Sequence, residues 1–316
     1  MPTRFSSLLL IVFGFLPLMC VGCSNADPAV SNVAMKAFDA RAERIGRLKD
    51  AIVPFYRPMT VENGDWLDTQ KEPGETFEEY IASNPTLPTA ERRTIYIQPI
   101  GTFTAKQREA IRLTAEYMRA FYNLPVKLNA DRQLGNVPND KKRESGYPKR
   151  TQIRTQYFLD DVLPKLLKDD TAALIAFTNY DLYPGDTWAF VFGQATLQNR
   201  VGVWSLHRLS ELSRNYPNAL LDRTLKIAMH ETGHMFSMRH CTKYECLMSG
   251  TNHLAETDRR PIDACPECMA KVAWAMNYDP ELRYENLAAF WRKNGRKDFE
   301  KQMLEMAAAI EKLDSN

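Results

Sequence analysis

The sequence predicts a globular α/β protein (α+β in the broader classification), for three reasons. The chain has 316 residues, of which 44% are hydrophobic and 25% are charged, which is ordinary for a soluble protein with a substantial core. Short strand-like runs alternate with helix-like periodic segments from residue 93 onward. No internal repeat or low-complexity tract interrupts this alternation. Length alone allows one large domain or two small ones.

The first residues of the chain have the pattern of an export signal. Arg4 provides a sparse positive region, and the apolar run over residues 8–19 is too short to span a bilayer. Cys23 follows small residues, as in the cleavage sites of bacterial lipoproteins, although Cys20 stands where such sites usually carry leucine. We therefore predict a lipoprotein signal peptide over residues 1–22, with Cys23 acylated. The mature chain would be lipid-anchored in the cell envelope, at the outer membrane or the periplasmic face.

Two alternatives to the lipoprotein signal remain open. An ordinary signal peptide cleaved nearby would give a secreted protein, and an uncleaved segment would act as an anchor. All three interpretations place the protein outside the cytoplasm.

Residues 23–53 are predicted to be a tether followed by a helix. The helix is indicated by apolar residues at helical spacing over residues 35–49. Residues 54–92 hold five prolines and few regular patterns. We interpret them as an ordered but irregular N-terminal wrap, because their aromatic residues Trp66, Phe77 and Tyr80 would need burial.

Residues 93–280 are predicted to form the main domain. Five short apolar runs predict strands, at residues 95–100, 125–128, 172–177, 187–192 and 200–205. Three periodic segments predict helices, at residues 105–122, 152–167 and 218–236. Residues 241–268 are rich in loops. Residues 281–316 are predicted to be a C-terminal helical extension, closed by an amphipathic helix with Phe299, Met303, Met306, Ile310 and Leu313 on its core face.

The charge of the chain excludes nucleic acid as its main partner. The formal net charge is only +2 at pH 7, so there is no basic surplus to displace the counterions of a nucleic acid. Basic residues do cluster within the polar stretch 129–150. We interpret that stretch as a solvated loop and not as a binding patch.

Three of the five histidines fall within eleven residues, at His230, His234 and His240. Histidines four apart on a helix project from one face about 6 Å apart, which suits two imidazoles that bind one zinc ion. Glu231 can then reach a water on the open coordination position and act as a base. For His240 to reach the same metal, the helix must end near residue 236. The alternative, a pair of ordinary helix histidines, is disfavoured by the offset of His240.

Four cysteines follow as two close pairs, Cys241 with Cys246 and Cys265 with Cys268. This spacing is typical of a structural zinc site, where four thiolates compensate the charge of the ion and leave no room for water. Two disulfides are the alternative, because the envelope is often oxidising. Against disulfides, one metal would account for every mature cysteine except Cys23.

Met248 lies between the two cysteine pairs. A methionine taken alone is most often core filler. Its position shortly after three histidines suggests a hydrophobic support turn beneath a catalytic zinc, where Met248 would pack without binding the metal.

The run from His230 to Cys268 resembles the archaemetzincin (archaelysin) family of zinc metallopeptidases. The likeness extends upstream to residues 181–195 and 205–209 and downstream to residues 252–258. Residues 66–80 are similar to the N-terminal part of the eukaryotic-type members. The resemblance therefore covers about residues 60–280.

The resemblance implies a fold and a site. The fold would be a compact metzincin-like domain, with a twisted, mostly parallel sheet whose one antiparallel edge strand, near residues 188–194, would pair with an extended substrate. This sheet would pack on the active-site helix, beside a loop-rich C-terminal subdomain stapled by zinc. Two zinc ions are implied: a catalytic one held by His230, His234 and His240, and a structural one held by Cys241, Cys246, Cys265 and Cys268. Glu231 matches the general base and Met248 the Met-turn.

The sequence departs from the family pattern at Ser237, where the family usually has glycine. Glycine suits a turn with positive φ, and serine costs about 1 kcal/mol more there. The stretch between Met248 and Cys265 is also one residue shorter than usual, which a loop can absorb.

The function predicted is hydrolysis of peptide bonds by a zinc-bound water that Glu231 activates. The partner would be a peptide or protein substrate. Two alternatives remain open: a non-catalytic zinc-containing module that binds peptides in the envelope, and a zinc amidase that acts on cell-wall peptides. The sequence predicts neither the cleavage preference nor the oligomeric state.

Overall fold

The computed structural model describes residues 40–315, except 146–148, 197–198, 214 and 216–217. Residues 41–316 group into one compact unit. The predicted signal peptide over residues 1–22 and the acylated Cys23 lie outside the described residues. No helix in the described part of the chain is long and apolar enough to cross a membrane.

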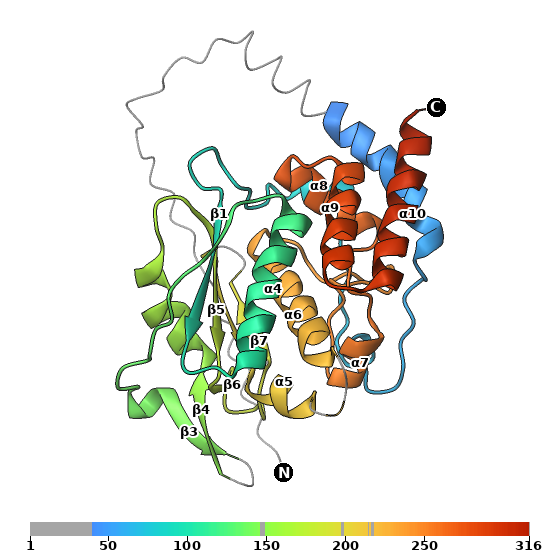
Figure 1. The fold of residues 1–316 in the computed structure, drawn as a ribbon. Coiled ribbons are helices and arrows are strands. Elements are labelled where there is room, and N and C mark those ends of the chain that lie inside the picture. Colours follow the sequence, from blue (N-terminus) through green and yellow to red (C-terminus); the bar gives the residue numbers. More distant parts are fainter. Residues whose placement is uncertain (1–39, 146–148, 197–198, 214, 216–217, 316) are drawn as a thin grey trace, which may run out of the picture. The chain divides into compact units, whose positions relative to one another are not determined.

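The principal sheet has five strands in the order β2-β1-β5-β8-β7 (Figure 1). Its neighbouring strands run parallel except β7, which is antiparallel to β8 and forms one edge. The predicted mixed sheet with one antiparallel edge strand is therefore confirmed. The strands are β1 (Thr94–Ile100), β2 (Val126–Leu128), β5 (Thr171–Thr178), β7 (Gly193–Ala195) and β8 (Val201–Ser205).

The edge strand is shorter than predicted and begins later. The sequence placed a strand at residues 187–192, but only Gly193–Ala195 pairs with β8. The preceding residues form a loop in which Trp188 is 48% exposed and Val191 makes an isolated bridge to Leu182. Their aromatic side chains produced the strand-like pattern, but these side chains line a cleft instead of filling the core.

A second, three-stranded sheet was not predicted. It has the order β3-β4-β6, built from β3 (Lys142–Ser145), β4 (Arg150–Arg154) and β6 (Asp181–Tyr183). The prediction of a solvated loop over residues 129–150 is wrong where β3 and the start of β4 lie. The basic side chains of β3 remain partly exposed, so a polar hairpin could be taken for a loop.

The predicted helix over residues 152–167 is also wrong in its first three residues, and helical structure begins at residue 155. Residues up to Arg154 belong to β4, and only then do a π-helical turn, η3 (Tyr157–Val162), and a 3-10 turn, η4 (Pro164–Leu166), follow. The side-chain amide of Gln152 is buried and donates to Asp181 Oδ2 at 3.0 Å and to the carbonyl oxygen of Ala189 at 2.9 Å. These partners belong to distant segments, and they favour the strand.

The helices agree better with the sequence. The predicted helices at 105–122 and 218–236 are α4 (Ala105–Tyr122) and α6 (Ala219–Met235). The C-terminal helical extension consists of α9 (Pro280–Lys293) and α10 (Lys297–Asp314). Shorter helical elements are the segment 40–48, η1 (Lys49–Phe55), α2 (Trp66–Thr69), α3 (Phe77–Ala82), η2 (Asn139–Lys141), α5 (His207–Leu212), α7 (Leu254–Arg259) and α8 (Pro266–Met276).

The principal sheet is buried on both faces. Along β5, Ile175 and Phe177 belong to the core shared with α4 and α6, which lie side by side in Figure 1. Leu174 and Ala176 point to the other face and pack with the residues of η3. Burial on both faces explains the nearly continuous apolar sequence of this parallel strand. The sheet thus fixes α6, the helix that carries the histidine motif, with its C-terminal half beside β7.

The N-terminal wrap is ordered and contacts the end of α6. Phe77 and Tyr80 are buried, as predicted, and Trp66 is partly buried. The hydroxyl of Tyr80 donates to the carbonyl oxygen of Phe236 at 2.7 Å, which satisfies a backbone group at the helix end. The wrap therefore anchors the turn after α6.

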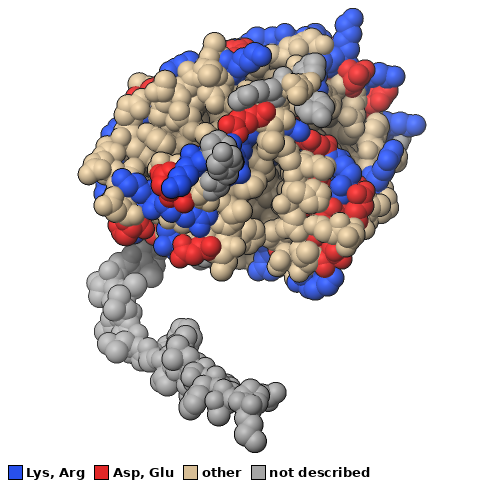
Figure 2. Space-filling model, turned by 90° about the horizontal axis from the view of Figure 1, so that it is seen from below, with Lys and Arg blue, Asp and Glu red and all other residues tan. Residues whose placement is uncertain are grey.

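Charges of both signs are interspersed on the face of the molecule seen in Figure 2. No single-sign patch dominates that face, which agrees with the low net charge of the chain.

Candidate metal centres

Helix α6 ends at Met235, next to residue 236, where it had to end for His240 to reach the other two histidines. The amide of Ser237 donates to the carbonyl oxygen of His234, and that of Met238 to Gly233, which is the hydrogen-bond pattern of a Schellman motif. Ser237 has φ of 64°, the left-handed conformation for which the family pattern has glycine. The cost of about 1 kcal/mol is partly offset because the backbone amide of Thr86 donates to Ser237 Oγ at 3.0 Å. The chain therefore makes the sharp turn with serine at position 237 in place of glycine.

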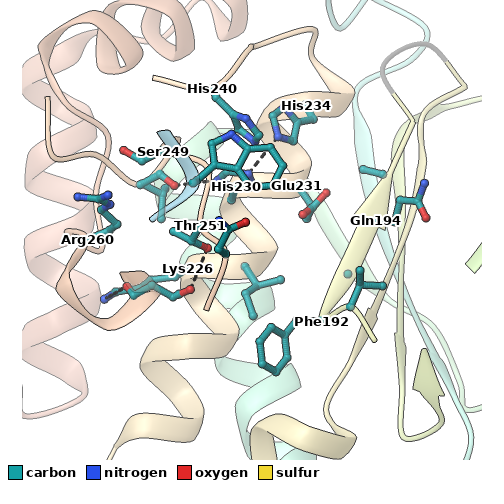
Figure 3. Close-up of a pocket in the computed structure, with 18 of the residues that line it drawn as sticks. Phe192, Gln194, Lys226, His230, Glu231, His234, His240, Ser249, Thr251 and Arg260 are labelled. Carbon is teal, nitrogen blue, oxygen red and sulfur yellow. Dashed lines mark hydrogen bonds between the residues drawn. The ribbon is translucent and has the colours of Figure 1, made fainter. Parts of the chain in front are cut away.

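This turn brings His240 back to the two histidines of α6. The ring centroids of the three are 4.6, 4.9 and 5.2 Å apart. Each offers a ring nitrogen, and these nitrogens lie within 4.8 Å of one another. Figure 3 shows the rings of His230, His234 and His240 pointing toward a common centre.

The hydrogen bonds of the rings fix which nitrogen faces that centre. Nδ1 of His230 lies 2.9 Å from the carbonyl oxygen of Leu247, and Nδ1 of His234 lies 2.7 Å from that of Met238. A carbonyl oxygen only accepts, so each Nδ1 must carry the proton and each Nε2 must present a lone pair. Nδ1 of His240 lies 2.8 Å from an oxygen of Glu72, which fixes the third ring in the same way.

The donor set fits a zinc ion. The Nε2 atoms of His230 and His234 are 3.0 Å apart, and two unprotonated nitrogens at that distance repel unless a cation lies between them. Zn–N bonds of about 2.0–2.1 Å in tetrahedral geometry would separate two nitrogens by about 3.3 Å. Burial also lowers the pKa of His230 well below its usual value and lowers that of His234 to about 4, so both rings are neutral at pH 7, as a metal ligand must be.

Glu231 lies beside the three rings, between α6 and the edge strand. Its carboxylate points toward β7 in Figure 3. Burial raises the pKa of Glu231 to about 7, and a hydrogen bond from the backbone of Ala195 opposes that shift. A carboxyl group in such surroundings exchanges a proton readily near neutral pH, which is the property of a general base.

Met248 packs against Gly233, the one glycine of α6, which immediately precedes His234. A Cβ atom on Gly233 would lie only 2.6 Å from the sulfur of Met248. A larger residue at this position would have to displace the end of the Met248 side chain. Met248 is 2% exposed, and its role as a support turn beneath a catalytic zinc stays a prediction.

The four cysteines form a second, fully protein-enclosed cluster. They are free thiols in the structure, and their sulfur atoms lie within 4.8 Å of one another, with Cys241 Sγ and Cys265 Sγ 3.5 Å apart. Zn–S bonds of about 2.3 Å in tetrahedral geometry would place sulfurs about 3.8 Å apart. The backbone amides of Met248 and Cys265 both donate to Cys246 Sγ at 3.3 Å, which would stabilise the thiolate that binds a metal. This cluster also fits one zinc ion.

A third group of potential ligands does not fit a metal. Asp65, His253 and Glu256 offer ligand atoms within 4.8 Å of one another. However, Asp65 already forms an ion pair with Arg259 at 2.7 Å, and Glu256 forms one with Arg260 at 2.8 Å. These guanidinium groups supply the positive charge that a cation would bring.

A cleft of about 600 Å³ opens over the histidine cluster. Its walls include residues that the sequence analysis did not assign to the site: Trp66, Phe192, Lys226, Ile227, Asn252 and Arg260. Two of these were within reach of sequence reasoning, because Lys226 and Ile227 lie one helical turn before His230 on α6. For Trp66 the sequence predicted burial but not a place in the site. Its position in the wall shows that the N-terminal wrap reaches the cleft.

Comparisons with known proteins found a matching family model, similar curated proteins and similar solved structures. The sequence model of peptidase family M54 matches residues 118–273. Archaemetzincin-2 of Macaca fascicularis is 32% identical over 290 residues, which cover 79% of this chain and 78% of that protein. Archaemetzincin-2 of Homo sapiens is 34% identical over 271 residues, which cover 74% of each chain. The crystal structure of an archaemetzincin from Methanopyrus kandleri is 26% identical, with a TM-score of 0.46, and covers 63% of this chain and 98% of its own.

Proposed function

We infer that this chain, which belongs to peptidase family M54, the archaemetzincin family of zinc metallopeptidases, cleaves peptide bonds in the cleft above α6 with Glu231 as its general base. Family membership makes the protein a zinc-dependent hydrolase of peptides or proteins. The observation that supports the finer assignment is the convergence of three imidazoles beside a buried carboxylate.

We assign two zinc ions to the chain. His230, His234 and His240 would hold the catalytic ion, and the four cysteines would hold the structural one. When bound to the three histidines, zinc would polarise the scissile carbonyl and make the attacking water more acidic. The second ion would be inert, because four thiolates leave no open position.

The side chains of this chain perform the proton transfers. The carboxylate of Glu231 accepts a proton from the attacking water as the water oxygen bonds to the carbonyl carbon of the substrate. It then delivers that proton to the leaving nitrogen as the C–N bond breaks. The backbone of Ala195 orients the carboxylate for both transfers.

The outer edge of β7, where the backbone of Ala195 also bonds Glu231, is suited to hold an extended substrate. The carbonyl oxygen of Phe192 and the amide of Thr196 both bond to the β8 side. Because alternate residues of an antiparallel strand bond the same neighbour, the backbone groups of Gly193 and Ala195 face the other way, toward the cleft. A peptide bound there as an added strand would pass directly over Glu231.

Peptide cleavage tests this proposal. We expect the zinc-loaded protein to generate new peptide termini from a complex peptide mixture, as identified by mass spectrometry. Removal of zinc with a chelator should abolish cleavage, and restoring zinc should recover it. His230→Ala is the variant control, since it lacks one catalytic ligand and should be inactive. Peptides that bind without being cut would instead identify a non-catalytic binding module.

We also propose that Cys23 is acylated and tethers the mature chain to the cell envelope. The support is the sequence alone: an apolar run followed by small residues and a cysteine. Wild-type protein expressed in a bacterium should incorporate labelled fatty acid, whereas Cys23→Ser should not. Equal labelling of the two proteins would refute the anchor.

A further inference from the structure

We propose that Glu72 is a positioning residue for the histidine metal centre, and that the N-terminal wrap is therefore part of that centre and not only a cover. The inference rests on the proposed assignment of zinc to the three histidines. His240, the third proposed ligand, lies outside α6 and lacks the support of a helix.

The partner of His240 differs from those of the other two ligands. Nδ1 of His230 and of His234 each face a backbone carbonyl oxygen from a neighbouring turn. Nδ1 of His240 faces both oxygens of Glu72, at 2.8 and 3.1 Å. Among the described contacts of the three rings, Glu72 is the one charged acceptor. A carboxylate that accepts from Nδ1 fixes the tautomer and makes Nε2 a stronger electron donor toward a metal.

The loop that carries Glu72 is shaped to fit the chain around His240. Gly74 has φ of 75°, and a Cβ atom there would lie 2.2 Å from the hydroxyl oxygen of Thr242. The hydroxyl of Thr242 in turn donates to the carbonyl oxygen of Pro73 at 3.4 Å. Glycine is thus required for the loop to approach residue 242, two positions beyond the ligand.

A buried ion pair fixes the other end of this loop. Glu75 bonds to Lys271 Nζ at 2.9 Å, and their side chains are 5% and 1% exposed. Lys271 Nζ also donates to the backbone oxygen of Glu75 at 2.7 Å. Lys271 lies on α8, the helix that starts at the second cysteine pair. The loop is therefore held between the two metal centres, which leaves Glu72 little freedom to turn away from His240.

Trp66 restrains the same ring from a second direction. Its ring meets that of His240 edge to face, with centroids 5.2 Å apart. Trp66 itself is packed so closely that a Cβ atom on Gly250 would lie 2.4 Å from it. Both restraints on His240 thus come from residues before 93, outside the segment 118–273 that matches the family model.

Substitution of Glu72 should weaken the catalytic zinc site selectively. We expect Glu72→Gln to reduce the affinity of that site for zinc by about 10–100-fold, the usual effect of losing such a partner of a ligand. Glu72→Ala, which removes the acceptor altogether, should lose at least as much. Glu78→Gln is the matched control. It removes a carboxylate from the same segment, but its side chain is 67% exposed and pairs with Lys49.

Zinc affinity is measured by competition with a chromophoric chelator, so the readout does not depend on activity. Cobalt substitution separates the two centres, because sulfur-to-cobalt charge-transfer absorption arises only where cysteines bind the metal. That absorption and the circular dichroism should be unchanged in Glu72→Gln, which shows that the fold and the cysteine site are intact.

The outcomes distinguish this inference from the proposed function. If His230→Ala loses the zinc of the histidine site but both Glu72 variants retain wild-type affinity, the role of Glu72 is refuted while the metal site stands. If His230→Ala also retains both zinc ions, the histidine site itself is wrong. A loss of affinity in Glu78→Gln equal to that in Glu72→Gln would also refute the specific role of Glu72.

Discussion

Glu231→Gln is expected to retain both zinc ions and to lose about 10²–10⁴-fold in the rate of peptide hydrolysis, the contribution of a positioned general base. Glutamine has nearly the same shape as glutamate and can still meet the backbone of Ala195, but it cannot accept a proton from water near pH 7. None of the seven proposed metal ligands changes. The loss should therefore appear in the rate and not in the metal content.

The measurement pairs peptide cleavage with metal analysis on the same protein samples. Glu285→Gln is a suitable control, since this exposed carboxylate on α9 is remote from the residues that line the cleft. Full activity in Glu231→Gln would refute the assignment of the base. Loss of zinc in the same variant would show instead that Glu231 acts through the metal site.

Cys265→Ser is expected to have the largest effect on stability. Structural zinc sites contribute about 10–16 kcal/mol of binding free energy that is coupled to folding. Cys265 is fully buried and caps α8, while its partners Cys241 and Cys246 lie in the loop that also supplies His240 and Met248. Without the fourth thiolate, this loop would lose its attachment to α8. We expect the zinc content to fall from two ions to about one, with a lower melting temperature.

Ala264→Ser controls for the new hydroxyl group. It places a serine at the adjacent buried position and leaves all four thiols in place. Its zinc content should remain at two ions. The disulfide alternative gives the opposite pattern in the wild-type protein. In that case the wild-type protein would bind one zinc ion and not two, and a reducing agent would destabilise it.

The clustering of the three histidines could be predicted from the sequence because their spacing is local. His230 and His234 share one face of a single helix, and the position of His240 follows from where that helix ends. The family pattern even identified the conformation of Ser237, since a position that usually carries glycine has φ of 64°. In each case a short stretch of chain determines the geometry.

Glu72 could not be predicted in this way. It lies 168 residues before His240, and nothing in its immediate sequence indicates a histidine partner. The prediction of a helix at Gln152 was wrong for a related reason. Its partners Asp181 and Ala189 lie 29 and 37 residues away, and they stabilise a strand where the local pattern suggested a helix. Polar side chains whose partners come from distant segments carry little local signal. The missed contact of Glu72 and the wrong helix at Gln152 both involve such side chains.

The central claim is that one zinc ion is held by three imidazoles and a second by four thiolates. An anomalous difference map at the zinc absorption edge, from a crystal of the purified protein, tests it directly. We expect two peaks, one about 2.1 Å from the Nε2 atoms of His230, His234 and His240 and one about 2.3 Å from the four cysteine sulfurs. A map without the first peak, in which the ring of His240 is turned away from the other two, would contradict the account.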